Sequence, residues 1–222
     1  LTAHEIEWRT IKDYATMSRE KSDAFFDSIV SRLKDRYELI GVYPLSILPV
    51  RGIRIFIDKL KHWYISQRAF DLYWDLDVWV NEKEAYKYFK KAWKALITDP
   101  IFRELCICNG KDFYHAIKDE LKAYFQVIFP LAIKNIEIAK KMIEEEKPNL
   151  ILIKDECADF GRALVVACKI KGVPTLAVQH GTITPTHGCY IFRKEEKGRV
   201  ILPDITCVYG EYYYDLLTKN SI

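Results

Sequence analysis

Three short apolar runs near the end of the chain constrain its fold more than any other feature. They are Leu150–Ile153, Val173–Val178 and Ile205–Tyr209. The first run is too short for a buried helix and too continuously apolar for a half-exposed strand, which predicts a central strand of a parallel sheet. Residues 161–171 have the pattern of a connecting helix, and Gly172 is placed to end it. This part of the chain therefore predicts a βαβ arrangement.

The residues before Pro148 follow a helical period instead. A β-type run at 39–43 interrupts this pattern and should join the sheet. Residues 66–80 are rich in aromatic side chains without a clean period and are expected to form a loop with a short ordered piece. Ser22 is a candidate N-cap for the first helix. Amphipathic patterns predict helices over residues 23–36, 52–63, 81–96 and 111–147, the last of them kinked or split at Pro130.

These patterns predict an α/β fold with two parts. Residues 1–148 form a mainly helical part with the early strand at 39–43, and residues 149–222 form the βαβ part. The length of 222 residues suits one compact domain in which the two parts share a core.

The overall charge gives no reason to expect a partner that is recognised mainly by its opposite charge. A net charge of +3, from 34 basic and 31 acidic residues, gives no electrostatic case for a nucleic-acid binder or a membrane-surface binder. The longest apolar stretch, Val127–Ile133, is too short to span a bilayer, so no transmembrane segment is expected. Six cysteines without a CxxC pair favour reduced thiols and a cytoplasmic protein without structural zinc. Because the chain begins with Leu, we expect it to be part of a longer protein.

Polar residues follow each of the three predicted strands. Because parallel strands end at the same edge of a sheet, these loops should form one ligand-binding edge. His180 is the first candidate, since an imidazole can take a proton from a hydroxyl near neutral pH, although it could equally satisfy a local turn. Asp155 and Glu156 could orient that histidine or bind sugar hydroxyls, or could merely cap the following helix. The other residues of these loops are Gln179, Gly181, Thr182, Gly210 and Glu211.

Common nucleotide and metal motifs are missing from the sequence. It contains no GxGxxG, no GxxxxGK[ST] and no HExxH, so a dinucleotide site, a P-loop and a zincin are unsupported. His187 and His180 alone do not make a metal site. No metal or other cofactor is expected.

Three segments resemble a known family: KPNLILIKDE, GRALVVACKIKGVPTLAVQHGTITPTH and LPDITCVYGEYYYDLLTK. They are similar to the N-terminal, acceptor-side domain of GT-B-fold glycosyltransferases that build surface polysaccharides. The HGT of residues 180–182 is also similar to a motif of CDP-glycerol glycerophosphotransferases, in which the matching histidine acts as a base. The resemblance implies a Rossmann-like parallel sheet flanked by helices, forming half of a GT-B fold.

The resemblance also implies a reaction and roles for the residues. A sugar would pass from a nucleotide-sugar to a hydroxyl of a glycan or lipid-linked acceptor, with His180 as base and Glu156 beside it. The donor would bind a C-terminal domain that is absent from this chain, so the chain alone should be inactive. Peripheral membrane association stays open. The residues expected to bind substrate are Asp155, Gly161, Arg162, Gln179, Gly181, Thr182, Gly210 and Glu211.

Alternative functions remain on the same sequence evidence. A nucleotide-sugar epimerase or a phosphoglycerol transferase would keep the fold and change the chemistry. A non-catalytic binding or assembly domain is favoured if the long helices, rather than the strand ends, carry the larger exposed apolar surface.

Overall fold

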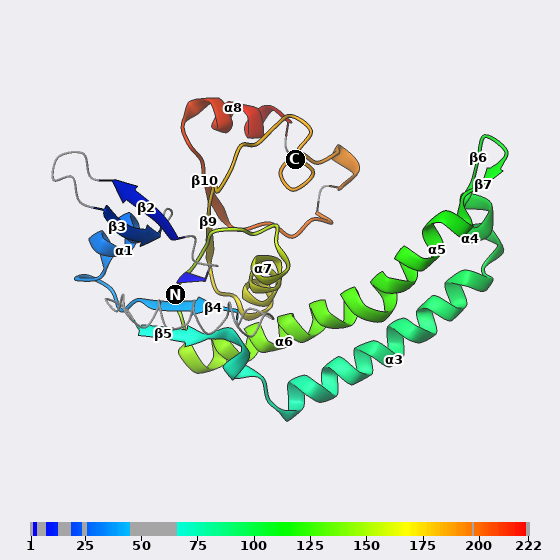
Figure 1. Cartoon of the computed structure of the whole chain (residues 1–222), viewed down its shortest axis with the longest axis horizontal. Helices are drawn as coiled ribbons and strands as arrows, with labels where there is room; N and C mark the ends of the chain where they lie inside the picture. The colour runs from blue at the N-terminus through cyan, green and yellow to red at the C-terminus, as the bar shows by residue number, and fades with distance from the viewer. Residues whose placement is uncertain are drawn as a thin grey trace.

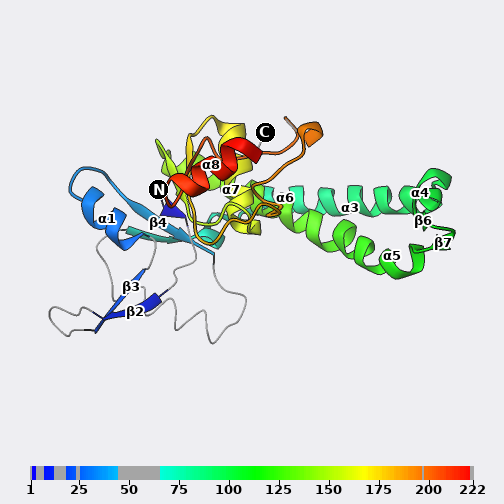
Figure 2. The same cartoon turned by 90° about the horizontal axis from the view of Figure 1, so that it is seen from above.

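The protein consists of an α/β body from which a long helical arm projects (Figures 1 and 2). This computed structural model describes residues 2–3, 8–12, 19–23, 26–44, 66–196 and 198–220. The helical arm, residues 76–146, runs away from the body and returns to it.

Six strands of the described residues form one parallel sheet in the order β10-β9-β8-β1-β4-β5. Chain order runs outward in both directions from the neighbours β1 and β8, so the strand order reverses between them. Strands from both sides of Pro148 thus share one sheet. The strands are β1 (Thr2–Ala3), β4 (Ile40–Tyr43), β5 (Ser66–Ala69), β8 (Ile151–Ile153), β9 (Thr175–Val178) and β10 (Ile205–Cys207).

The structure contains the strand predicted at 39–43 and the three predicted after residue 148, and it adds β1 and β5 to the sheet. Residues 66–80 hold more regular structure than the short ordered piece that the sequence predicted within a loop. Strand β5, the 3-10 turn η1 (Phe70–Tyr73) and the start of a helix follow one another there. Each piece is too short to display its own period, which explains why no pattern was visible.

Strand β8 is buried on both faces, as its continuous apolar sequence requires. Ile151 and Ile153 pack with α6 (Phe129–Glu146) and α7 (Asp159–Lys171), whereas Leu152 packs with Phe26 and Val30 at α1 (Asp27–Leu33) on the other face. Helix α7 ends at Gly172, which adopts a left-handed conformation with φ 70°. That ending matches the sequence prediction.

The first predicted helix is shorter than its sequence pattern suggested. Ser22 does not cap it, because residues Arg19–Asp23 form β3, which pairs with β2 (Trp8–Lys12). Helix α1 begins after Phe26, whose side chain is buried but makes no capping hydrogen bond. Strand pairing therefore takes precedence over the local capping signal here. The helix predicted over 52–63 lies outside the described residues.

The arm is a helical hairpin held together by aromatic rings. Phe89 of α3 (Leu76–Thr98) lies with its ring centroid 6.4 Å from that of Phe125 and 5.2 Å from that of Phe129. The helix begins earlier than predicted, at Leu76, and its N-cap is Asp75, whose Oδ1 accepts a hydrogen bond from Val78 N at 2.9 Å. No helix in the described ranges is long and apolar enough to span a bilayer.

The returning leg of the arm is interrupted where the sequence contains a proline. Instead of one helix over 111–147, the structure has α5 (Tyr114–Ala123), a π-helical turn η2 (Tyr124–Ile128) and then α6. Pro130 lies in the first turn of α6, where its missing N–H costs least. Residues Lys111–Asp112 belong to a small hairpin, β6 (Ile107–Cys108) with β7, rather than to the helix. The predicted split is thus made by a wider helical turn.

The start of β10 is fastened to β9 by Asp204. Its Oδ2 accepts hydrogen bonds from Thr175 N and Thr175 Oγ1, both at 2.8 Å, and its Oδ1 pairs with Lys169 Nζ of α7. The Lys169 ammonium and the Thr175 donors lower the pKa of Asp204 to about 2. Thr175 is 1% exposed, so its hydroxyl has little access to replacement water.

We predict that Asp204→Ala destabilises the protein by about 1–2 kcal/mol at pH 7, because it leaves buried Thr175 donors unpaired. The carboxylate with a lowered pKa stabilises the fold above about pH 4 and loses this effect as the pH falls toward 2. The stability difference between variant and wild type, measured by urea unfolding, should therefore shrink over that range.

Asp215→Ala is the matched control. Asp215 forms an exposed i, i+4 pair with Lys219, so its removal should change the unfolding free energy by less than about 0.5 kcal/mol. A D204A variant as stable as this control would show that the clamp contributes nothing.

Candidate active site

The polar residues predicted at the ends of β8 and β9 come together at one edge of the sheet. One possible ligand atom from each of Asp155, Glu156 and His180 lies within 4.8 Å of the other two. Strands β8 and β9 are parallel neighbours, so their carboxyl ends meet although the sequence separates them. The structure therefore assembles the predicted cluster.

Asp155 has two contacts that serve different purposes. Its Oδ1 accepts hydrogen bonds from Cys157 N and Ala158 N, both at 3.0 Å, which shapes the turn into α7. The same oxygen lies 3.7 Å from His180 Nε2, an ion-pair distance when the imidazole is protonated. Both the capping interpretation and the orienting interpretation of this residue thus have a structural basis.

Glu156 is a carboxyl group inside the protein. It is 2% exposed, and its Oε2 makes no hydrogen bond within the described residues. Burial, the largest cause, raises the pKa of Glu156. The group is therefore easier to protonate than an ordinary glutamate.

His180 has one buried and unpartnered ring nitrogen. Its Nδ1 is buried without a hydrogen-bond partner in the described part of the chain, while the side chain as a whole is 26% exposed. A group arriving from solvent can consequently reach only Nε2, the nitrogen that faces Asp155.

Tyr190 closes the site from the loop that follows β9. Both Tyr190 and Ile183 are buried, so this loop is anchored. The Tyr190 hydroxyl is adjacent to the Glu156 carboxyl group without a hydrogen bond of ordinary geometry, and burial together with that carboxylate raises the pKa of Tyr190. The aromatic and apolar residues at 190–192, inside a charged and glycine-containing stretch, were the available sequence signal.

Two cysteines lie beside the same carboxylate. Burial is the main cause that raises the pKa of Cys157, with the neighbouring Cys189 thiol and Glu156 adding to it. Both cysteines are free. A thiol with a raised pKa stays protonated, so Cys157 is not a candidate nucleophile.

Gly161 is required by packing. A Cβ atom at this position would lie 1.8 Å from the backbone oxygen of Asp155, so only glycine lets α7 approach the end of β8 this closely. Its neighbour Arg162 donates from Nη1 to Ile201 O at 2.7 Å, which ties α7 to the segment before β10. Their predicted role in substrate binding stays a prediction, and both have structural roles.

Gln179 also has a structural role, because its side chain links two loops by hydrogen bonds. It is fully buried, its Nε2 donates to Gly181 O at 2.7 Å, and its Oε1 accepts from Tyr209 N at 2.8 Å. These bonds fix the end of β9 to the residues after β10. His180 is held in place by these hydrogen bonds.

The remaining predicted binding residues are exposed at the strand ends. Gly181 has open space around it, so no close backbone contact within the described residues explains it. Gly210, with φ +94°, precedes α8 (Glu211–Asn220). Whether these residues, which are Gly181, Thr182, Gly210 and Glu211, bind a substrate stays a prediction.

No family model, curated protein or solved structure matches this chain. The geometry of the site and the resemblance in its motifs therefore carry the functional argument.

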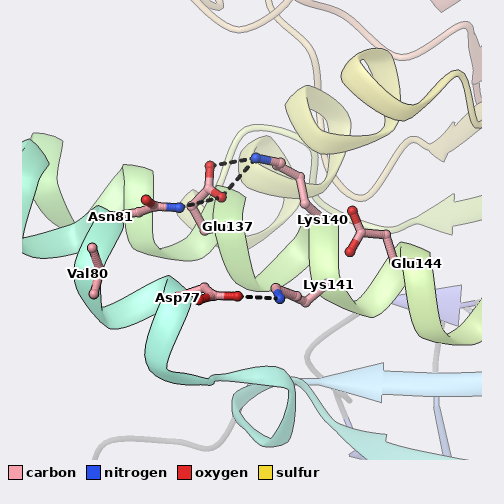
Figure 3. Close-up of a pocket in the computed structure, with 7 residues that line it drawn as sticks. All are labelled: Asp77, Val80, Asn81, Glu137, Lys140, Lys141 and Glu144. Atoms are coloured by element: carbon pink, nitrogen blue, oxygen red, sulfur yellow. Dashed lines mark hydrogen bonds and ion pairs between the residues drawn. The ribbon is translucent and has the colours of Figure 1, made fainter.

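A hollow between α3 and α6 is a second place where polar side chains gather (Figure 3). Its charges are paired with one another. Lys140 Nζ bonds both oxygens of Glu137 at 2.8 and 2.9 Å, and Lys141 Nζ lies 2.8 Å from Asp75 and 3.1 Å from Asp77.

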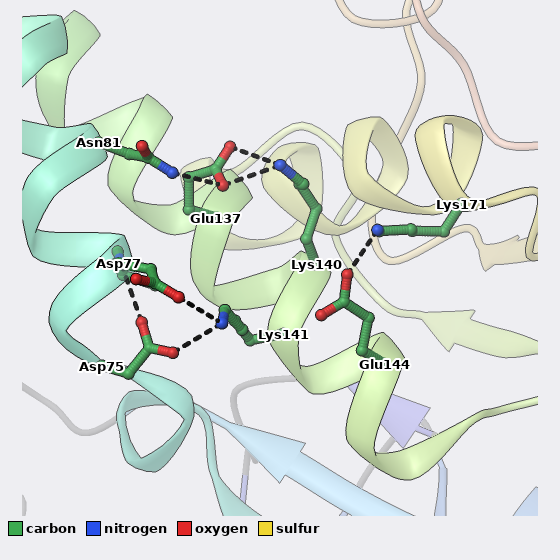
Figure 4. A network of polar contacts seen from close by, with 9 residues as sticks. Asp75, Asp77, Asn81, Glu137, Lys140, Lys141, Glu144 and Lys171 are labelled. Carbon is green, nitrogen blue, oxygen red and sulfur yellow. Dashed lines mark hydrogen bonds and ion pairs between the residues drawn. The ribbon is translucent and has the colours of Figure 1, made fainter.

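The same network continues to α7, where Lys171 Nζ contacts Glu144 at 2.5 Å (Figure 4). Asn81 adds a hydrogen bond from its Nδ2 to Glu137 at 3.1 Å. Because each of these charged groups has a partner of opposite charge, we interpret the hollow as the polar root of the arm rather than as a binding site.

We predict that Gly161→Ala destabilises the protein by about 1–3 kcal/mol, since its Cβ would push α7 away from β8. Thermal unfolding measures the loss. Gly181→Ala is the matched control, because its Cβ meets open space and should leave the melting temperature almost unchanged. Equal stability of the two variants would contradict the close approach.

We also predict that Glu156→Gln stabilises the protein at neutral pH. A carboxyl group whose pKa is raised on folding stabilises the native state below its unfolded pKa and costs stability as the pH rises through the folded value. Unfolding free energies should therefore favour the variant at pH 7 and converge near pH 4. A variant less stable than wild type at pH 7 would show that the ionised carboxylate has a stabilising partner.

Proposed function

We propose that this chain is the acceptor-side domain of a GT-B-type glycosyltransferase, which transfers a sugar from a nucleotide-sugar to a hydroxyl of a glycan or lipid-linked acceptor. The observation that carries the proposal is the meeting of His180 with Asp155 and Glu156 at the carboxyl ends of two parallel strands. The resemblance of the three motifs supplies the reaction class.

The topology supports a ligand site at this edge. The strand order corresponds to 3-2-1-4-5-6 when the sheet strands are numbered along the chain, which is the doubly wound, Rossmann-like order. In such sheets ligands bind outside the carboxyl ends of the strands, next to the point where the order reverses. Strand β8, which leads into Asp155 and Glu156, is one of the two strands at that point.

The proposed reaction uses His180 as a general base. Nε2 takes the proton of the acceptor hydroxyl as its oxygen bonds to the anomeric carbon of the donor, and the nucleoside diphosphate leaves with the electron pair of the broken bond. Asp155, 3.7 Å from Nε2, stabilises the imidazolium that forms. Buried Glu156 lies beside this pair as the second acidic residue of the site.

The resemblance also implies which domain binds the donor and which binds the acceptor. In the family that the motifs resemble, a second domain holds the nucleotide, and this chain contributes the face that receives the acceptor. A hollow near the site, between α6 and α7, measures about 120 Å³. Ligand pockets usually measure about 300–1,000 Å³, so this hollow alone does not suit a nucleotide-sugar.

An epimerase or a phosphoglycerol transferase would use the same edge of the sheet, and the donor turned over by the complete enzyme separates these reactions. A non-catalytic binding role has one observation in its favour, because many of the exposed large apolar side chains lie on the helical arm. That surface is compatible with catalysis at the strand ends.

We predict that His180→Asn in the complete enzyme lowers kcat by roughly 100- to 10,000-fold, the usual contribution of a positioned general base. Donor affinity, measured by calorimetry, should stay close to that of wild type. His115→Asn is the control, because His115 is an exposed histidine on the arm and should leave turnover unchanged.

The melting temperature separates chemistry from structure. His180 is partly exposed and lies outside the main core clusters, so its replacement should hardly change stability. Near-wild-type turnover combined with a loss of several kcal/mol in stability would assign His180 a structural role and refute the proposal.

A further inference from the structure

Three buried polar side-chain atoms of the described residues have no hydrogen-bond partner, and all three lie at the candidate site. They are Glu156 Oε2, His180 Nδ1 and the Tyr190 hydroxyl oxygen. Folded proteins leave few buried polar atoms unsatisfied, and a bound ion or water molecule is a common reason for those that remain. The gathering of such atoms in one place indicates that this site is built to hold a ligand.

The charge of the cluster favours a cation over a water molecule. None of the ion pairs among the described residues joins Asp155 or Glu156 to a Lys or Arg. The Nε2 atom of His180 lies 3.7 Å from Asp155 Oδ1, which is too long for a hydrogen bond. A divalent cation would neutralise both carboxylates, whereas a water molecule would leave their charges uncompensated.

The spacing of the possible ligand atoms suits one metal ion. A carboxylate oxygen of Asp155, one of Glu156 and a ring nitrogen of His180 lie within 4.8 Å of one another. Metal bonds to such oxygens and nitrogens measure about 2.0–2.2 Å, so two ligands of one ion lie up to about 4.4 Å apart. A side-chain movement of a few tenths of an ångström therefore brings all three ligands within reach of one ion.

The site is held by the fold and is open to solvent on one side. Glu156 is 2% exposed, and the hydrogen bonds of the Gln179 side chain fix the backbone next to His180. The side chains of Asp155 and His180 are 39% and 26% exposed, so an ion can enter past them. The sequence predicts no metal, because these ligands follow two separate strands and form no local motif.

We propose that Asp155, Glu156 and His180 bind a divalent transition-metal ion. Oxygen ligands alone would suit Mg²⁺ or Ca²⁺, whereas an imidazole nitrogen favours a transition metal such as Fe²⁺ or Zn²⁺. Three protein ligands leave a coordination position open for water or another small ligand. Binding of the ion does not depend on the proposed reaction.

The bound ion should inhibit the proposed reaction. An imidazole that binds a metal through one nitrogen carries its proton on the other, so His180 would have no lone pair left for the proton of the acceptor. This consequence rests on the proposed function and is measured as turnover of the complete enzyme with and without the ion. Turnover that requires the ion would keep the metal site and refute His180 as the base.

Titration of the chain with Co²⁺ tests the binding itself. Co²⁺ accepts the same ligands, and its visible absorption separates thiolate ligands from oxygen and nitrogen ligands. Calorimetry should show one ion per chain, bound roughly tenfold or more tightly than Mg²⁺. His180→Asn and Glu156→Gln should each lower the Co²⁺ affinity by roughly tenfold or more, since even the loss of an outer-shell partner costs about 10- to 100-fold.

The double variant His115→Asn, Glu120→Gln is the matched control. Both residues are exposed on α5 of the arm, so Co²⁺ binding should stay at the wild-type level. Cys157→Ser should also bind like wild type, because thiols take no part in the proposed site. Circular dichroism checks that each variant is folded.

Three results would overturn the proposal. The first is wild type that binds no Co²⁺ up to about 1 mM, where binding is already weak. The second is a folded Glu156→Gln or His180→Asn variant that binds Co²⁺ like wild type. The third is a thiolate absorption band that Cys157→Ser removes, which would assign the ion to the cysteines.

Discussion

The close approach of α7 to the end of β8 is the contact on which the rest of the site depends. Gly161 lies where any Cβ would overlap the Asp155 carbonyl oxygen, so the helix begins directly over the strand end. The turn between them is then so short that Asp155 and Glu156 have no room to leave the sheet edge. The Asp155 carboxylate holds the turn before the helix, and the Glu156 carboxyl group is buried in the interior.

His180 is positioned by the neighbouring strand in a different way. Both ends of the buried Gln179 amide form hydrogen bonds with backbone groups, one in the loop after β9 and one after β10. His180 is the next residue in the chain. The close contact of α7 with the end of β8, together with the hydrogen bonds of Gln179 at the end of β9, therefore brings three titratable groups together. A buried carboxyl oxygen and a buried ring nitrogen without partners cost stability, and proteins retain such groups mainly where they serve a function.

The sequence predicted the βαβ part well because each of its elements displays its own period or ending. The run Leu150–Ile153 is apolar at every position, and Gly172 marks the end of α7. The cluster itself could be predicted from topology alone, since parallel strands end at one edge. The position of Tyr190 over Glu156 could not be predicted, because no local sequence pattern indicates which residue of a long loop packs against a buried carboxyl group.

The arm and the early strands were harder to predict for reasons that are also physical. Ser22 carries a capping signal that strand pairing overrides, and β5 is too short to show a period. The signal for the β6–β7 hairpin, which follows α4 (Pro100–Leu105), was present in the dipeptide Asn109-Gly110, whose two positive φ angles make the turn.

The apolar residues around that turn are too few to form a core of their own, so the local sequence specifies a shape and leaves its outer surface uncovered. The paired charges lie at the root of the hairpin, where they tie α3 and α7 to α6 and so fix the direction of the arm relative to the sheet.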